Sequence, residues 1–355
     1  MVGTNHKAGV VDDEALMAFG RVKQNLWRES WIGGIATVGD PLGRSGSWLG
    51  GVDFTYATSH FRGDKNLLVG AWGLATDREG LGSDRTAHGF KIDYPNDLWD
   101  IAFVYKRIGR DFDPSIGFVP RPAVYLYNAQ INNSTRIARG PLQRLFHEFE
   151  PSVAIDLHGR WESYRVFMAP INWRFKSGDR FEFNVNPTGE RLVEPFEIGG
   201  VTIQPGTYEW RRYRLEVGTA QKRRLYSQVT WWFGGFYDGR LDQYQWTGAW
   251  NPTPLFTIEF SGERDVSRGL SAGDFTEMVV GARARLNMSP DLNFAGYVQY
   301  ETATESIGLN TRLRWTFRPV ADLFVVYNHN VRDLLDRWRL DSNQLLVKLQ
   351  YAFRY

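Results

Sequence analysis

The densest group of side chains that could bind a metal or activate water lies between residues 147 and 158. Its members are two histidines and three carboxylates: His147, Glu148, Glu150, Asp156 and His158. Histidine combined with carboxylate can bind a transition metal or act as a general base. The spacing matches no familiar metal or catalytic site. We therefore treat His147, Asp156 and His158 as weak metal candidates, against the simpler interpretation that they are polar lining residues. The sequence predicts no cofactor.

Five cations near the C-terminus form a second group, because each alternates with apolar residues along an extended stretch. They are Arg283, Arg285, Arg312, Arg314 and Lys348. In a packed core each would be a buried charge that costs roughly several kcal/mol. A water-filled lumen removes that cost, which favours a barrel over a β-sandwich. The five could form a basic ladder that selects anions, or a salt-bridged wall neutralised by Glu259, Glu277 and Glu301. Arg211–Arg214 and Lys222–Arg224 look like a polar rim.

The segment DFDPSIGFVPR, Asp111–Arg121, is the candidate for a constriction loop. Its prolines stiffen it, and Gly117 permits a tight turn. Phe112 and Phe118 are the expected anchors against a wall. The alternative is a surface loop with two buried aromatics. The candidate residues of this loop are Asp111, Phe112, Pro114, Gly117, Phe118 and Arg121.

Extended segments must position these residues, because the chain shows about 19 extended segments and no convincing helix. They start near Ala15, Ser30, Ser47, Lys65, Thr86, Leu98, Ala123, Leu145, Trp161, Arg180, Thr207, Leu225, Asp242, Leu255, Phe275, Asp291, Ile307, Ala321 and Asn343. We expect a polar lead-in over residues 1–14 and one barrel domain over residues 15–355. Ile131–His147 is where a miscount is most expected. Bacterial single-chain barrels are usually even-numbered, so an odd count leaves three possibilities: a miscount, a strand before Ala15, or completion by a missing N-terminal region or partner chain.

The last stretch, NQLLVKLQYAFRY, shows the alternation most clearly. One side of the predicted strand is apolar and aromatic, from Leu345 to Tyr355, and the other is mostly polar. A closing strand of a membrane barrel has this pattern, and we interpret Tyr351, Phe353 and Tyr355 as the insertion signal read by the barrel-assembly machinery.

The connections between these segments alternate in length. Short ones are Leu26–Glu29, Arg62–Asp64, Tyr94–Asp97, Ser177–Asp179, Asn251–Pro254, Met288–Pro290 and Arg318–Val320. Long ones are Gly39–Gly46, Asp77–Arg85, Arg107–Pro122, Pro187–Gly206, Arg264–Gly273 and Val331–Ser342. This alternation is typical of the periplasmic turns and outer loops of an outer-membrane barrel.

Composition excludes several classes of protein. The 355 residues include no Cys, which rules out disulfides and thiolate chemistry. The net charge of +2 gives no electrostatic reason to expect nucleic acid. No run of 18 apolar residues occurs, so no transmembrane helix is predicted. The 14 Trp, 16 Tyr and 23 Phe fit a filled β core or two aromatic girdles. We find no signal peptide at the start, although an exported barrel requires one.

Several motifs resemble a family of uncharacterised outer-membrane β-barrel domains. The loop motif is GRDFDPSIGFVPR at Gly109–Arg121, and the others are RVKQN at Arg21–Asn25, SWIG at Ser30–Gly33, GVDF at Gly51–Phe54 and SNQLLVKL at Ser342–Leu349. In that family the barrel usually follows a family 9-type carbohydrate-binding module. The resemblance implies that this chain is the C-terminal portion of such a protein, and it implies no reaction and no catalytic residues.

We therefore expect an all-β antiparallel transmembrane barrel of about 18–20 strands in the outer membrane of a Gram-negative cell. The leading hypothesis is a non-enzymatic pore or translocation conduit in outer-membrane lipid, with a saccharide cargo suggested by the family's carbohydrate module. The alternatives are an outer-membrane hydrolase with a His/carboxylate site, and a barrel that only anchors a partner or binding module. No local catalytic signature favours an enzyme.

Overall fold

The computed structural model describes residues 2–4 and 15–352. Their structure consists of β-strands joined by turns and loops, and it contains no helix. Accordingly, this described part of the chain has no helix long and apolar enough to cross a membrane. The expectation of an all-β antiparallel fold is confirmed.

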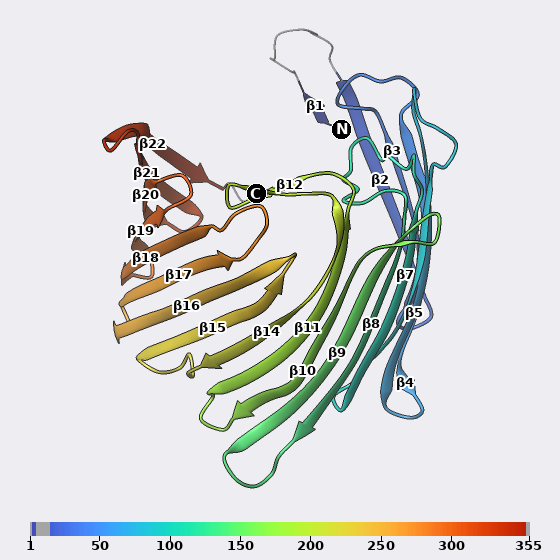
Figure 1. Ribbon diagram of the computed structural model, residues 1–355. Coiled ribbons are helices and arrows are strands. Elements are labelled where there is room, and N and C mark those ends of the chain that lie inside the picture. The colour runs from blue at the N-terminus through green and yellow to red at the C-terminus, as the bar shows by residue number, and fades with distance from the viewer. Residues whose placement is uncertain (1, 5–14, 353–355) are drawn as a thin grey trace. The chain divides into compact units, whose positions relative to one another are not determined.

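Twenty-two strands follow one another within the described residues (Figure 1). The first eleven are β1 Val2–Thr4, β2 Ala15–Leu26, β3 Ser30–Val38, β4 Trp48–Phe61, β5 Lys65–Asp77, β6 Thr86–Pro95, β7 Trp99–Ile108, β8 Val124–Arg136, β9 Leu142–Asp156, β10 Trp161–Phe175 and β11 Arg180–Leu192. The others are β12 Phe196–Ile198, β13 Val201–Ile203, β14 Gly206–Gly218, β15 Leu225–Phe236, β16 Gly239–Thr253, β17 Phe256–Arg268, β18 Thr276–Ser289, β19 Leu292–Glu301, β20 Ser306–Arg318, β21 Ala321–Asp333 and β22 Trp338–Tyr351.

Nineteen of these strands are long, and each corresponds to one of the predicted extended segments. The uncertain region Ile131–His147 contains the end of β8 and the start of β9, so no strand was missed there. Three short strands were not predicted. Strand β1 lies in the expected polar lead-in and pairs with Ala15–Met17 of β2. Strands β12 and β13 form a hairpin inside the expected loop Pro187–Gly206.

The chain divides into two compact units, which we describe separately. The first unit is residues 1–135, 146–168 and 188–191, and the second is residues 136–145, 169–187 and 192–355. Strands β9, β10 and β11 contribute residues to both, as does β8 through its last residue, Arg136.

In the first unit, strands β2 to β8 pair antiparallel in sequence order. Side chains of one cross-strand row point to the same face of a sheet. The row Gln24, Ile32, Phe54, Ala71, Phe90, Tyr105 and Tyr127 belongs to a face rich in exposed apolar side chains. The next row begins with Lys23 and contains Asp53 and Lys106, and it belongs to the opposite face. We call these the apolar face and the polar face of the first unit.

The second unit repeats this division across strands β14 to β22, which also pair antiparallel in order. The row Glu216, Thr230, Gln245, Glu263, Val279, Glu301 and Ser306 lies on its polar face. The row Leu286, Phe294, Leu313, Val325 and Val347 lies on its apolar face. The alternation of the sequence therefore places most charged side chains on one face and most large apolar side chains on the other.

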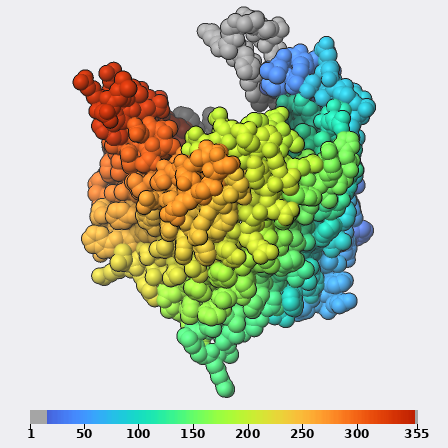
Figure 2. Space-filling view, viewed as in Figure 1, coloured from blue at the N-terminus to red at the C-terminus, as the bar shows by residue number. Residues whose placement is uncertain are grey.

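Strand β22 carries the terminal motif and lies at the surface (Figure 2). Leu345, Val347, Leu349 and Tyr351 belong to the apolar face, and Leu346 and Lys348 belong to the polar face. The predicted alternation of this strand is therefore correct up to Tyr351. Phe353 and Tyr355, the other two residues of the predicted insertion signal, lie outside the described residues.

Successive connections lie alternately at the two ends of the strands. At one end they are turns of two to six residues, and we call this the short-turn end. The other end, the long-loop end, carries the longest connections, at 39–47, 78–85, 109–123 and 193–205. The predicted alternation holds in the first part of the chain but not throughout: the long-loop end also carries the two-residue turn 237–238 and the four-residue turns 157–160, 302–305 and 334–337. The prediction of a long connection at Val331–Ser342 is therefore wrong, because β21 and β22 extend into that stretch.

Candidate functional site

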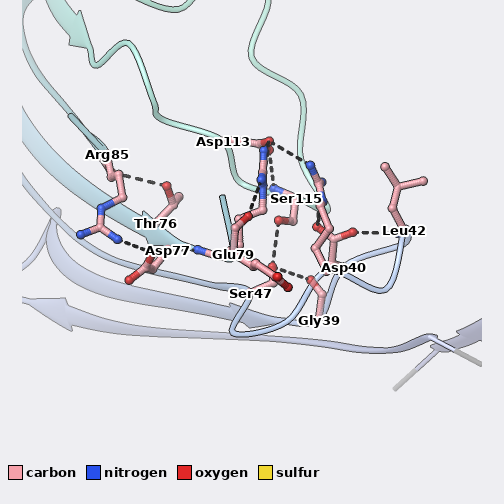
Figure 3. A network of polar contacts seen from close by, with 12 residues as sticks. Gly39, Asp40, Leu42, Ser47, Thr76, Asp77, Glu79, Arg85, Asp113 and Ser115 are labelled. Atoms are coloured by element: carbon pink, nitrogen blue, oxygen red, sulfur yellow. Dashed lines mark hydrogen bonds and ion pairs between the residues drawn. The ribbon is translucent and has the colours of Figure 1, made fainter. Parts of the chain in front are cut away.

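Three long connections of the first unit pack against one another through polar contacts (Figure 3). They are residues 39–47, 78–85 and 109–123. The Ser47 hydroxyl donates to Ser115 Oγ at 2.8 Å. Asp113 forms ion pairs with Arg78 at 2.6 Å and with Arg44 at 3.7 Å. Burial alone would raise the pKa of Asp113, but the hydrogen bond from Arg78 and the Ser115 N–H outweigh it and lower that pKa.

Asp84 is a second link between two of these connections. Its carboxylate accepts hydrogen bonds from Arg107 Nη2 at 2.9 Å and from the Arg110 N–H at 3.0 Å. In return its own N–H donates to the Asp111 carboxylate at 3.1 Å. Burial works against ionisation of Asp84, yet its donors outweigh burial and lower the pKa. The connections 78–85 and 109–123 approach each other so closely here that a Cβ added to Gly82 would lie 2.3 Å from Asp111 Oδ2.

Phe112 fixes the predicted constriction loop to the polar face of the first unit. Its side chain is only 7 % exposed and packs in a cluster with Leu49 and Ala87. The other members of this cluster are Ile35, Trp72, Leu74, Ile108 and Val119. Ile35, Leu74, Ala87 and Ile108 belong to one cross-strand row of the polar face. The loop therefore folds over that face. Phe118, which was expected to be a second anchor, is instead 86 % exposed.

The other candidate residues of the loop have structural contacts. Pro114 and Gly117 form a tight turn, in which a Cβ on Gly117 would lie 2.9 Å from Pro114 Cγ. Arg121 Nη1 donates to Ser163 Oγ on β10 at 2.8 Å, and Arg121 lies 3.9 Å from Glu162. Arg121 and Ser163 also line a cavity of about 300 Å³. Arg121 thus holds the end of the loop to a neighbouring strand.

The second unit has a comparable inward-folded element, the β12–β13 hairpin. Ile203 of β13 is buried in a cluster with Leu241, Tyr237, Leu270 and Phe275. Leu241 precedes Gln243 by two residues on β16, so both belong to the polar face of this unit. The hairpin therefore covers the polar face near the long-loop end.

A buried ionic cluster lies beneath this region on strands β11 and β14. Arg214 Nη1 contacts Glu182 at 2.7 Å and donates to Asn184 Oδ1 at 3.0 Å. Glu216, which is 1 % exposed, forms ion pairs with Arg214 and with Arg180, the latter at 2.6 Å. The prediction that Arg211–Arg214 is a polar rim is wrong for Arg214, which lies within β14 and joins this cluster. Glu182 and Asn184 lie on β11, which the sequence alone does not bring next to β14, whereas Glu216 lies two residues along on β14 itself.

Next to the cluster, the polar face contains a cavity of about 520 Å³ lined by Glu263, Asp265 and Glu277. Gln243 and Gln245 donate to Glu263 at 2.5 and 3.1 Å. Asp265 Oδ1 is buried without a hydrogen-bond partner among the described residues. Such an atom is costly unless water or a solute satisfies it, so this cavity is suited to hydrated polar solutes.

The five predicted ladder cations all lie on the polar face of the second unit. Arg285 and Arg312 share one cross-strand row, and Arg314 and Lys348 share the next. Of the expected neutralising residues, Glu259 contacts Arg283 and Arg285. Glu277 and Glu301 instead lie nearer the long-loop end. Asp322, which the sequence did not single out, pairs with Arg314 at 3.0 Å.

The weak metal candidates do not form a site. His147 and Asp156 are nine residues apart on the single strand β9, which corresponds to about 30 Å. The Asp156 carboxylate accepts from the backbone N–H of His158 at 2.9 Å and pairs with Arg160 and Arg191. Asp156 therefore organises the β9–β10 turn. Among residues 2–4 and 15–352, no group of three His, Cys, Asp or Glu residues could hold a metal ion.

No protein-family model matches the chain, and no curated protein sequence matches it significantly. The resemblance to the carbohydrate-module-associated barrel family therefore stays a prediction. In each unit one face is charged, is partly covered by a loop or hairpin and contains a polar cavity, and the opposite face is apolar.

Proposed function

We propose that the chain is an outer-membrane β-barrel protein that forms a conduit across the outer membrane of a Gram-negative cell. The observation that carries the proposal is the separation of chemistries on each antiparallel sheet. In both units one face is charged and the other presents large exposed apolar side chains. A bilayer requires apolar residues outside and permits polar residues around a lumen.

The extent of the apolar surface is difficult to reconcile with a protein surrounded by water. Soluble monomers rarely expose contiguous apolar patches larger than a few hundred Å². Here such side chains recur along nearly every strand, from Val22 on β2 and Phe103 on β7 to Trp250 on β16 and Leu349 on β22. A long exposed strand such as β22 would also promote aggregation in water. Acyl chains would remove that penalty.

Aromatic residues on the apolar faces lie near both ends of the strands. Near the short-turn end they include Tyr94 and Trp99 in the first unit, and Trp250, Trp315 and Tyr351 in the second. Near the long-loop end they include Trp48 and Tyr300. Aromatic rings concentrate at both membrane–water interfaces of barrels, whose periplasmic turns are short and whose outer loops are longer. We therefore assign the short-turn end to the periplasmic interface and the long loops to the outer side.

The loop at 109–123 and the β12–β13 hairpin are the narrowing elements of the proposed conduit. Each packs on a polar face near the long-loop end through buried apolar anchors, Phe112 in one case and Ile203 in the other. Elements held in this way would reduce the open cross-section of the proposed conduit without blocking it completely. The hydrolase alternative has no comparable support, since His147 and Asp156 are far apart. The saccharide cargo stays a prediction from the family resemblance.

The membrane part of the proposal is tested by heat-modifiable migration of the detergent-extracted chain. A folded barrel resists the detergent of a cold gel, so we expect unheated and boiled samples to migrate differently. As a second readout, the protein should co-sediment with outer-membrane vesicles after a high-salt wash. A protein that stays monomeric and soluble without detergent would overturn the proposal.

A further inference from the structure

Five cations lie together on the polar face of the second unit, toward the short-turn end. They are Arg283, Arg285, Arg312, Arg314 and Lys348, which we call the basic patch. Carboxylates of the same face, Glu263, Asp265, Glu277 and Glu301, lie toward the long-loop end, and Arg332 continues the row of Glu263 and Glu301 there.

The carboxylates near the basic patch do not neutralise it. Glu259 contacts Arg283 at 3.8 Å and also pairs with Arg285. Asp322 pairs with Arg314 at 3.0 Å. Arg312 and Lys348 form no ion pair with any described residue. Five cations against two carboxylates leave the patch with three uncompensated positive charges.

Phe324 holds the two central guanidinium groups in place. The Cζ of Arg312 lies 4.9 Å from the centroid of the Phe324 ring, and the Cζ of Arg314 lies 5.9 Å from it. Phe324 pairs with Arg314 on one side and with Lys348 on the other, so all three side chains share one row. Two strand spacings separate the outer members of this row by about 10 Å at the backbone. Cation–π contact of this kind orders arginine without consuming its N–H donors.

We propose that the basic patch is a binding surface for small oxyanions, such as phosphate, sulfate or a carboxylate group, with Arg312 and Lys348 as its free cations. A guanidinium presents paired N–H donors that match the oxygens of an oxyanion, and an ammonium adds a point charge. The proposal deepens the proposed conduit and rests on it for its biological meaning, because it states which solutes the wall attracts.

A thiol-reactivity experiment tests this without requiring conduction. The chain contains no Cys, so Leu346→Cys introduces a unique thiol. Leu346 is 51 % exposed, lies on the polar face two residues from Lys348, and pairs with Val326, the cross-strand partner of Arg312. The rates of modification by an anionic and a cationic methanethiosulfonate reagent are measured on the folded chain in detergent at low salt. Their ratio reports the local potential.

We expect the anionic reagent to be favoured at Leu346→Cys. Adding Arg312→Gln and Lys348→Gln should lower the anionic-to-cationic rate ratio by about 50-fold. Each charge at ~7 Å in water changes each rate about threefold, and each of the two substitutions slows the anionic reagent while it speeds the cationic one. The difference should shrink at 1 M salt, where the screening length falls to about 3 Å. Arg312→Lys keeps the charge and should keep most of the ratio.

Two controls separate the patch from bulk charge and from misfolding. Val347→Cys lies on the apolar face of the same strand, so its ratio should not respond to the double substitution. Lys222→Gln with Arg224→Gln removes the same charge from an exposed turn and should leave the Leu346→Cys ratio unchanged. An unchanged ratio after removal of Arg312 and Lys348, or an equal change in the turn control, would overturn the proposal.

The outcome is distinguishable from failure of the conduit. The expected ratio change in a protein that conducts no ions would keep the oxyanion surface and reject the conduit. Steady conductance with no ratio change would keep the conduit and reject the oxyanion surface.

Discussion

Removing the Phe112 ring should undock the loop at 109–123 from the polar face. The ring is 7 % exposed in a cluster with Leu49 and Ala87. Truncation of a buried Phe to Ala costs about 3–5 kcal/mol. If the loop undocks locally, a loss of about 3 kcal/mol increases the open population by about 150-fold.

Amide hydrogen exchange followed by mass spectrometry measures this directly. The docked loop has internal and external hydrogen bonds, including the Gly109 N–H to Thr86 O at 2.9 Å and the Asp111 N–H to Asp84 O at 2.9 Å. We expect Phe112→Ala to accelerate exchange in peptides covering 109–123 by about 100-fold or more, with strands β14–β22 unchanged.

The matched control is Phe118→Ala in the same loop. Phe118 is 86 % exposed, so its truncation should change stability by no more than about 0.5 kcal/mol. Equal acceleration in the two variants, or no acceleration in Phe112→Ala, would refute the docking argument.

Three further predictions concern the same loops and the ionic cluster. Gly82→Ala should lower the free energy of docking of the loop at 109–123 by about 1–3 kcal/mol in the same exchange assay, because the added Cβ would lie 2.3 Å from Asp111 Oδ2. Its control is Gly73→Ala, whose added Cβ meets no atom within 4 Å and should leave exchange of the loop unaltered. The folded-state pKa of Asp113 is lowered, so its contribution to docking is fully present above the unfolded value of about 4 and is lost as pH falls through the folded value. Loop exchange, corrected for the intrinsic rate, should therefore be constant from pH 5 to 8 and accelerate below about pH 4; a rise already at pH 6 would exclude this origin. Arg214→Met leaves buried carboxylates without their partner and should destabilise the fold by about 3–5 kcal/mol, seen as a lower temperature of heat modification; no decrease would show that the cluster does not stabilise the fold.

Sequence alternation predicted the long strands well because each has one mainly apolar and one mainly polar face over most of its length. Alternation with a period of two depends only on neighbouring residues. The alternating stretches 292–300 and 343–351 therefore reveal their strands without knowledge of the strands that pair with them. The same rule correctly placed Arg283, Arg312 and Lys348 on one face.

Contacts across strands and loops could not be predicted in this way. Arg214 looked like part of a rim because its partners on β11, Glu182 and Asn184, could not be identified before the strands were paired. Nothing in the sequence of the loop distinguishes Phe112 from Phe118. In the structure only Phe112 packs against the apolar row that contains Leu74 and Ala87. The short β12–β13 hairpin was hidden because three-residue strands carry almost no alternation.

The histidine and carboxylate group shows the opposite failure. Proximity in sequence between His147 and Asp156 suggested a site, but an extended strand separates its ends by about 3.3 Å per residue. Residues close in sequence on one strand are therefore poor candidates for a shared ligand unless they are two apart.

Single-channel conductance of the purified, detergent-refolded chain in a planar bilayer tests the conduit most directly. We predict steady, reproducible steps for the unmodified chain, and larger steps for Phe112→Ala, since the docked loop narrows the lumen. Absence of steps from both proteins, in a preparation that is heat-modifiable and inserted in the bilayer, would contradict the conduit.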